Sequence, residues 1–144
     1  MTTRDRALSL DALLLPQEPH GTFHDGQLRQ LTVNYEDASY LLAFQLCVGD
    51  PDAADQAERE RVRFGHLRLT QVLFWVCEPP DPIPVVPGGA AWLSSFGPLS
   101  KSPTETGRGL ALLVPAEAEA WYLYFSDTNS FTYVAAKGHA FHWE

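Results

Sequence analysis

The sequence predicts a single domain over residues 1–144 that is mainly β: an antiparallel sandwich or partly open barrel of about seven strands, with a short N-terminal helix. Three observations support this prediction. Several runs alternate apolar and polar residues with a period of two, as half-buried strands do. Separators of hairpin length, rich in Asp, Asn, Ser and Gly, join these runs. Aromatic residues, which favour strands, make up 12% of the chain, and a hydrophobic content of 45% is enough for one buried core.

The N-terminal segment, residues 1–19, is predicted to contain the short helix. Its leucines form a loose apolar stripe that would dock on the sheet: Leu8, Leu10, Leu13 and Leu14. Asp11 and the proline-flanked residues 16–19 do not match a secretory signal peptide. Because no apolar run approaches the length that spans a bilayer, we expect a soluble, cytoplasmic protein.

Two alternating runs, residues 31–35 and 40–48, should pair as an antiparallel hairpin across the polar residues 36–39. The next segment, residues 49–60, holds five acidic residues and one arginine, which predicts a solvated loop. This segment does not match a calcium-binding EF-hand loop, because its acids do not have the required spacing and the required glycine is absent.

The long run at residues 61–77 should lie inside the sheet, because residues 72–76 are apolar on both faces. Its alternation slips by one residue across Gly65 and His66, which predicts a β-bulge there. Residues 78–108 read as a long Pro/Gly-rich loop, with Trp92, Leu93 and Phe96 as apolar anchors. A loop of this length in a compact domain is usually functional.

The C-terminal part is predicted to contain a short buried strand at 109–114 and then a meander of three strands, at 119–126, 130–136 and 139–143. The closing strand should lie at a sheet edge, where Phe141 and Trp143 need covering. Either the N-terminal helix covers this edge or a second copy pairs with it as a two-fold dimer, and we favour the dimer. Cys47 and Cys77 are predicted as small buried residues, with a disulfide between neighbouring strands as the alternative.

The net charge of −8, from 18 acidic and 10 basic residues, argues against binding to nucleic acid or to anionic membranes. It favours a basic protein partner. No nucleophile, phosphate-loop, dinucleotide or zinc-protease motif is present in the sequence, and we predict no cofactor.

The histidines are the residues most suited to chemistry. His24, Asp25 and His66, with His20, could be recruited from loops and strand ends as metal ligands, although none of their spacings is a metal signature. The alternative is that the histidines are structural or exposed, and that Asp25, which precedes a glycine, bonds to its own turn.

Aromatic residues are more numerous in the C-terminal part than one sheet face requires. Trp121, Leu123 and Phe125 should point to one face, and Tyr122 and Tyr124 to the other. The two tyrosines are either the amphipathic outer face of the sheet or, with a neighbour such as Tyr133 or Trp143, a recognition patch.

The segment Phe23-His24-Asp25-Gly26-Gln27-Leu28, followed by an alternating hairpin and a Val-Arg-Phe strand, resembles small uncharacterised bacterial β-rich proteins that carry an F-H-D-x-x-L signature. Some of these are similar to immunity proteins of toxin systems. The resemblance covers residues 23–76 and loosely the closing strands, and the 78–108 segment departs from it. It implies inhibition or partner binding without catalysis.

The sequence therefore predicts a non-enzymatic binding module, immunity-like or regulatory, that engages a basic protein partner. The candidate binding residues are His24, Asp25, Tyr122, Tyr124, Trp92 and Phe96. An alternative is a small-molecule-binding barrel or sandwich in which residues 88–108, with Trp92 or Phe96, form a lid over an apolar cavity. A third option is a metal-dependent hydrolase that uses the His20, His24, Asp25 and His66 group.

Overall fold

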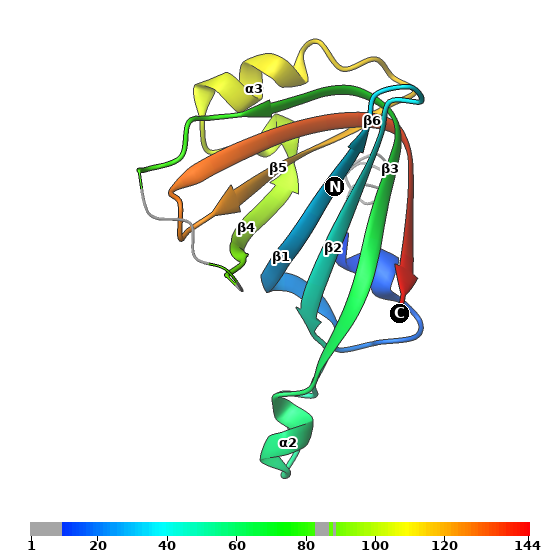
Figure 1. The fold of residues 1–144 in the computed structure, drawn as a ribbon, viewed down its shortest axis with the longest axis vertical. Coiled ribbons are helices and arrows are strands. Elements are labelled where there is room, and N and C mark those ends of the chain that lie inside the picture. Colours follow the sequence, from blue (N-terminus) through cyan, green and yellow to red (C-terminus); the bar gives the residue numbers. More distant parts are fainter. Residues whose placement is uncertain (1–9, 83–86, 88) are drawn as a thin grey trace.

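A computed structural model describes residues 10–82, 87 and 89–144. Within them, six strands form one closed antiparallel barrel in the order β1-β2-β3-β6-β5-β4 (Figure 1). The chain order is η1 (Leu10–Leu14), β1 (Thr22–Asn34), β2 (Ser39–Cys47), α2 (Gln56–Arg59), β3 (Val62–Cys77), β4 (Ala91–Pro98), η2 (Leu99–Lys101), α3 (Glu105–Ala111), β5 (Glu119–Phe125) and β6 (Ser130–Trp143). The prediction of a mainly β, antiparallel fold is confirmed. The sheet is a closed barrel, and it has six described strands where about seven were predicted.

The predicted hairpin of the first two strands is present, and β1 begins earlier than expected. The ladder between β1 and β2 runs from the pair Asn34–Ser39 at the turn to the pair Thr22–Cys47. Its register shifts between Thr22 and Gln27 and again between Leu28 and Gln30. The Asp37 carboxylate accepts hydrogen bonds from the N–H and the hydroxyl of Ser39, which closes the turn.

β3 is an internal strand, as predicted, because β2 and β6 pair along its two sides. The predicted bulge at Gly65 and His66 is wrong, since the register with both neighbours runs through these residues without a break. Gly65 instead makes room: a Cβ there would lie 3.0 Å from Phe141 Cε1 and 3.1 Å from Trp143 Cε3. The irregularity lies later, between Val72 and Phe74.

The prediction of a three-strand meander is wrong, because residues 119–143 form two strands, β5 and β6. The turn at 127–129 joins them, but the chain runs straight through Lys137 and Gly138 as one strand of 14 residues. Gly138 lies directly opposite Thr70, whose hydroxyl would collide with a Cβ. The residue therefore serves close packing of β6 on β3, and it does not make a turn.

Residues 78–108 are not one long loop. They contain β4, which closes the barrel, followed by η2 and the start of α3. The predicted strand at 109–114 is also wrong, because residues 105–111 are helical. Thr104 caps this helix by accepting the Gly107 N–H on its side-chain oxygen at 3.1 Å.

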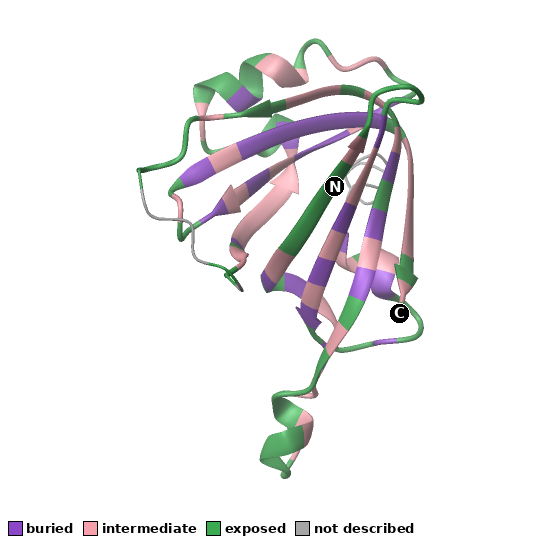
Figure 2. Ribbon diagram, in the orientation of Figure 1, coloured by how far each residue is buried: buried purple, intermediate pink, exposed green. Residues whose placement is uncertain are grey.

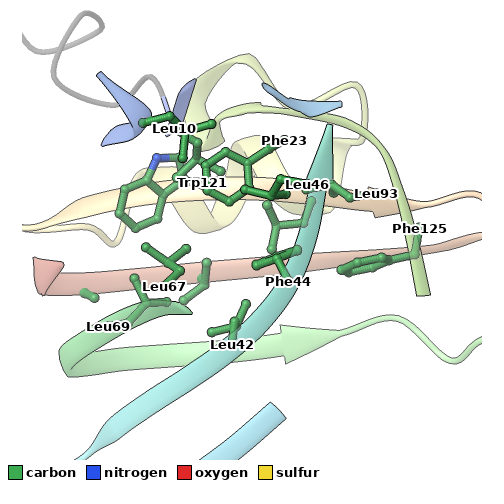
Figure 3. Packing of buried hydrophobic residues seen from close by; sticks show 14 residues of the cluster. Leu10, Phe23, Leu42, Phe44, Leu46, Leu67, Leu69, Leu93, Trp121 and Phe125 are labelled. Atoms are coloured by element: carbon green, nitrogen blue, oxygen red, sulfur yellow. The ribbon is translucent and has the colours of Figure 1, made fainter. Parts of the chain in front are cut away.

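The barrel interior is filled by apolar side chains from all six strands and from η1 (Figure 3). Phe23 lies at its centre, with ring centroids 5.3 Å from Phe44, 6.2 Å from Phe96 and 5.7 Å from Phe141. The predicted N-terminal helix is a five-residue 3₁₀ turn that buries Leu10 and Leu14.

The second half of β6, residues 137–143, pairs with β3 on one side, and no other described strand pairs with it. Phe141 and Trp143 pack against the barrel core, and η1 lies beside the strand. The dimer through this edge stays a prediction.

A second apolar cluster lies outside the barrel. Leu99, Ala120, Tyr133 and Ala135 are its buried members, with Leu110 and Ala111 of α3 packed against them. η2 and α3 thus cover the outer face of β5 and of the first half of β6, which Figure 2 shows as buried. The outer side of β1, in contrast, is coloured exposed along most of its length.

Cys47 and Cys77 are both free and exposed, so the predictions of burial and of a disulfide are wrong. Cys47 is the last residue of β2, and Cys77 is the last residue of β3. In the described parts of the chain, no helix is long and apolar enough to cross a membrane.

Candidate functional site

A continuous row of side chains crosses the uncovered outer face of the barrel. Trp92 of β4 lies opposite Gln27 of β1, Gln27 opposite Gln45 of β2, and Gln45 opposite Phe64 of β3. Directly opposed residues of an antiparallel pair project from the same face. Trp92, Gln27, Gln45 and Phe64 therefore form one row across four strands, which we call the aromatic–amide row.

The aromatic ends of the row face solvent. Trp92 is 43% exposed and Phe64 is 47% exposed, while their strand neighbours Leu93 and Gly65 are buried. The next opposed pair, Cys47 and Val62, is exposed as well. Large apolar side chains gathered on one exposed sheet face are typical of a contact surface.

Arg29 lies over the centre of the row. Arg29 follows Gln27 by two residues and so points to the same outer face, and the register shift between Leu28 and Gln30 leaves it without a ladder partner on β2. Arg29 Nη1 donates to Gln27 Oε1 at 3.0 Å and to Gln45 Oε1 at 3.4 Å. The guanidinium thereby joins the two amides in the middle of the row.

An acidic residue is hydrogen-bonded to the backbone at each aromatic end. The Trp92 backbone N–H donates to Asp127 Oδ1 at 3.0 Å, and the Glu144 backbone N–H donates to the Phe64 carbonyl at 3.0 Å, while Glu144 Oε1 lies 3.9 Å from His66 Nε2. Asp25 is a third exposed carboxylate on this side of the barrel. Although Cys47 as a residue is exposed, partial desolvation of its thiol raises the pKa of that group, and the charge of Asp25 raises the pKa further.

The Phe23–Leu28 segment owes its pattern largely to the fold. Phe23 enters the core, Asp25 has φ 61°, and a Cβ on Gly26 would lie 2.7 Å from Leu46 Cδ2 and 2.8 Å from the Phe23 carbonyl oxygen. His24 and Asp25 remain on the outside, with 3.3 Å between Nδ1 and Oδ2. Asp25 therefore both shapes the bulge, since Asp tolerates a left-handed backbone, and contributes charge to the outer face.

Tyr122 and Tyr124 lie on the other outer face, and the predicted division of β5 into two faces is observed. Tyr122 packs against Gly97 and Phe131, and Tyr124 Oη donates to Asn129 Oδ1 at 2.8 Å. Both tyrosines are half-buried. Their suggested neighbour Tyr133 is 0% exposed, so it is not part of an exposed patch.

Trp92 and Phe96 do not form a lid. They belong to β4, where Trp92 points outward and Phe96 packs against Phe23 inside the barrel. The part of the chain that was predicted to cover an apolar cavity is instead a wall of the barrel, and side chains of the core cluster fill the interior. The arrangement gives no support to the small-molecule alternative.

The four residues of the hydrolase option are not brought together. His20 Nε2 lies 3.8 Å from Asp50 Oδ2, and His66 Nε2 lies 3.9 Å from Glu144 Oε1 at the far end of β6. Across residues 10–82, 87 and 89–144, no group of three or more His, Cys, Asp or Glu side chains could hold a metal ion.

His139 is a structural histidine. Its Nδ1 lies 2.9 Å from the buried Oε2 of Glu119, and the edge of its ring contacts Trp121. This contact ties the start of β5 to β6 on the interior side.

An open pocket of about 370 Å³ lies at the start of β3 and the end of β6. Its lining is Gln17, Arg63, Phe141, His142 and Trp143. The Arg63 guanidinium stacks over the Trp143 ring at 4.6 Å and lies 3.4 Å from a Glu18 carboxylate oxygen. Phe64 is not a lining residue, and Arg63 precedes it on the opposite face of β3, so the pocket is separate from the aromatic–amide row.

The acidic loop at residues 49–60 carries α2, a single turn capped by Asp55, and it projects from the barrel beyond Cys47 and Val62 (Figure 1). The Arg59 guanidinium donates hydrogen bonds to the backbone carbonyl oxygens of Ala53 and Ala54. The exposed acids of this loop add negative charge at the same end of the barrel as Asp25.

Of the row, sequence reasoning identified only Trp92, and it placed that residue in a loop. Gln27, Gln45 and Phe64 lie at alternating positions of predicted strands, but their common row depends on the registers of three strand pairs. Phe64 was predicted only as one of the alternating apolar residues of the 61–77 strand. Searches against protein-family models, curated proteins and solved structures find no match.

Proposed function

We propose that this chain is a non-enzymatic binding module, immunity-like or regulatory, whose aromatic–amide row engages a basic protein partner. The observation that carries the proposal is an exposed aromatic side chain at each end of the row whose backbone is hydrogen-bonded to an acidic residue: Trp92 with Asp127, and Phe64 with Glu144.

A ring with an adjacent carboxylate is complementary to an arginine or lysine side chain. The ring face attracts the cation, which contributes about 0.5–2 kcal/mol depending on how far the pair is desolvated. The carboxylate accepts charge-assisted hydrogen bonds from the same group, in bidentate fashion when the cation is a guanidinium. Tryptophan, which Trp92 supplies here, and arginine, which the partner would supply, are also among the residue types that dominate binding energy at protein interfaces.

The spacing of the row constrains the partner. Its ends are three strand spacings apart, or about 14 Å. In an extended segment this distance corresponds to about four residues, at roughly 3.3 Å per residue. Arg29 lies between the two ends and repels a cation, so the partner should present a neutral or acidic group between its two basic residues.

The charge of the whole chain supports the same partner class. A net charge of −8 attracts a basic protein over a distance and speeds its association. The exposed acids of the 49–60 loop lie at one end of the row, where they would orient the approach. The resemblance of residues 23–76 to immunity-like proteins is in accord with partner binding without catalysis.

The test is capture of partners by the immobilised protein from a native lysate, compared across three forms: wild type, Trp92→Ser/Phe64→Ser, and Leu112→Ser/Leu113→Ser. The last is a matched control, because Leu112 and Leu113 are highly exposed leucines at the end of α3, on the covered side of the barrel. We expect a basic partner that wild type and the control retain, that the row variant loses, and that elutes at raised salt.

Two results would overturn the proposal. One is a partner that the row variant retains as well as wild type does. The other is an acidic partner whose binding is insensitive to salt, because neither the carboxylates nor the net charge would then take part.

A further inference from the structure

The pocket at the end of β6 lies along the edge of that strand. Its walls include three consecutive residues, 141–143. Because consecutive side chains point to opposite faces of a sheet, a cavity that contacts all three residues lies beside the strand and not over one face of it. Gln17, in the connection from η1 to β1, also lines the pocket, and Figure 1 shows this connection passing close to the C-terminus.

The backbone at this edge offers hydrogen-bonding groups. The Glu144 N–H donates to the Phe64 carbonyl oxygen at 3.0 Å, so Glu144 and, two residues earlier, His142 direct their backbone groups at β3. Phe141 and Trp143 alternate with them and direct their N–H and C=O groups to the opposite side. In the part of the chain that the structure describes, no strand pairs with that side. A ligand in the pocket can therefore bond to main-chain groups as well as to side chains.

The side chains of the pocket carry positive charge, although the chain as a whole is acidic. The described lining contains Arg63 and His142 but no Asp or Glu. Arg63 Nη1 lies 3.4 Å from Glu18 Oε2, while the two oxygens of Glu18 lie closer to Arg61, at 2.8 and 3.2 Å. Glu18 is only 4% exposed, and its charge is thus compensated mainly by Arg61. The remaining N–H donors of Arg63 are suited to a second anion.

We propose that this pocket binds a small organic carboxylate with a planar apolar body. The carboxylate accepts hydrogen bonds from the Arg63 guanidinium, whose planar fork matches such a group. The body of the ligand lies against the rings of Trp143 and Phe141, whose centroids are 4.8 Å apart in an edge-to-face contact. Gln17 and the main chain of the β6 edge supply the polar groups that fix the orientation.

The size and the aromatic wall of the pocket determine this choice of ligand. A volume of about 370 Å³ is near the lower limit of the roughly 300–1,000 Å³ found for ligand sites, which suits a small molecule. An inorganic anion would leave the rings of Phe141 and Trp143 without a contact. A neutral aromatic molecule would leave the Arg63 donors unused.

The inference does not depend on the aromatic–amide row. The pocket is separate from the row, and its ligand is an anion, whereas the row is proposed to engage a basic protein. The site also differs from the cavity predicted from the sequence, because that cavity would lie in the barrel interior, which core side chains fill.

Heteronuclear NMR of isotopically labelled protein, at neutral pH, measures the binding. The indole N–H signal of Trp143 is assigned by its loss in Trp143→Phe. Titration with benzoate, a probe with one ring and one carboxylate, should shift this signal and leave that of Trp121, which is 2% exposed in the core, in place. Benzamide, which has the same ring and no charge, should bind about tenfold more weakly or less. Inorganic phosphate, which has no ring, should also bind at least about tenfold more weakly.

Two variants and a matched control test the residues. Arg63→Gln removes the cation and Gln17→Glu adds a carboxylate to the lining, so each should raise the benzoate dissociation constant about tenfold or more. Arg68→Gln removes the same charge from the same strand, at an exposed arginine that lies 3.8 Å from Asp37 and outside the pocket. It should leave the dissociation constant unchanged. An unchanged Trp121 signal shows that each variant is folded.

Three results would overturn the proposal. The first is a Trp143 signal that stays in place at high millimolar benzoate. The second is equal binding of benzoate and either benzamide or phosphate, because the charge or the ring would then contribute nothing. The third is equal weakening by Arg63→Gln and Arg68→Gln, since net charge and not the pocket would then control binding. If Arg63→Gln does not fold, Gln17→Glu decides the question, because Gln17 is exposed and its replacement is close in size.

Discussion

Replacing Gly107 by alanine tests whether α3 packs over the sheet as described. A Cβ at this position would lie 2.6 Å from Ser102 Cβ and 2.9 Å from Tyr133 Cε1, and closer still to Ser102 Oγ. Ser102 is 2% exposed and Tyr133 is 0% exposed. Ser102 Oγ also accepts the Thr104 N–H at 3.2 Å, so it cannot rotate away without losing that bond.

The expected change combines three contributions. Overpacking a filled site destabilises by about 1–3 kcal/mol. Breaking the hydrogen bonds of Ser102 adds about 1 kcal/mol. Alanine regains about 1 kcal/mol over glycine within a helix. We therefore expect Gly107→Ala to lower the free energy of unfolding by about 2 kcal/mol.

Gly109→Ala is the matched control, two residues further along the same helix. No atom lies within 4 Å of a Cβ at this position, and the residue is exposed. Only the backbone effect remains, so the variant should be more stable than wild type by about 0.5–1 kcal/mol.

Urea denaturation followed by tryptophan fluorescence measures both variants, because Trp121 is buried in the core. The difference between the variants should be about 3 kcal/mol, which is about 10 °C in Tm for a domain of this size. If both alanines stabilise the protein, α3 does not rest on Ser102 and Tyr133. The tyrosine face of β5 would then be open, and it would compete with the aromatic–amide row as a contact surface.

Three further outcomes are expected. Hydrogen bonds from Arg61 lower the pKa of Glu18, so this carboxylate should contribute stability that is fully present above the unfolded-state pKa near 4.5 and is lost as the pH falls through the lower folded-state value. Urea titrations from pH 7 to acid should show a larger loss in wild type than in Glu18→Gln. Tyr133→Phe should lower the free energy of unfolding by about 1–3 kcal/mol, because it removes the buried hydroxyl that bonds to part-buried oxygens of Thr104 and Glu78; an unchanged Tm contradicts this. Both thiols should react with Ellman's reagent in the folded protein, Cys47 more slowly at neutral pH because partial desolvation and then the charge of Asp25 raise its pKa, and equal rates in the two single Ser variants would refute that order.

Local patterns predicted the strands whose side chains alternate and whose neighbours follow closely in the chain. β1, β2 and β3 were found in this way, as was the turn between β5 and β6. β4 was missed because its Ser, Gly and Pro residues carry little strand preference, and its place is set by pairing with β1 and β5, which are distant in sequence. α3 was missed because two glycines lower its helix propensity, although the Thr104 cap was present as a signal.

Glycine was the commonest source of error within strands. Gly65 was interpreted as a bulge and Gly138 as a turn, yet both lie in regular ladders and make room for Phe141 and Thr70 from the neighbouring strand. A sequence shows that a position has no side chain, but it does not show which side chain fills the space. The place of Phe64 on the exposed face could not be predicted either, since alternation fixes two faces and leaves open which of them is covered.

The aromatic–amide row depends on the place of Gln27 in two ladders. Gln27 lies opposite Trp92 of β4 on one side and opposite Gln45 of β2 on the other, and Gln45 lies opposite Phe64 of β3. Arg29 is two residues further along β1, on the same outward alternation as Gln27, and the register shift between Leu28 and Gln30 leaves it without a ladder partner on β2. Its guanidinium reaches both amide oxygens, at 3.0 and 3.4 Å. A one-residue change of register on either side of β1 would move Gln27 out of line with Trp92 or with Gln45 and would divide the row.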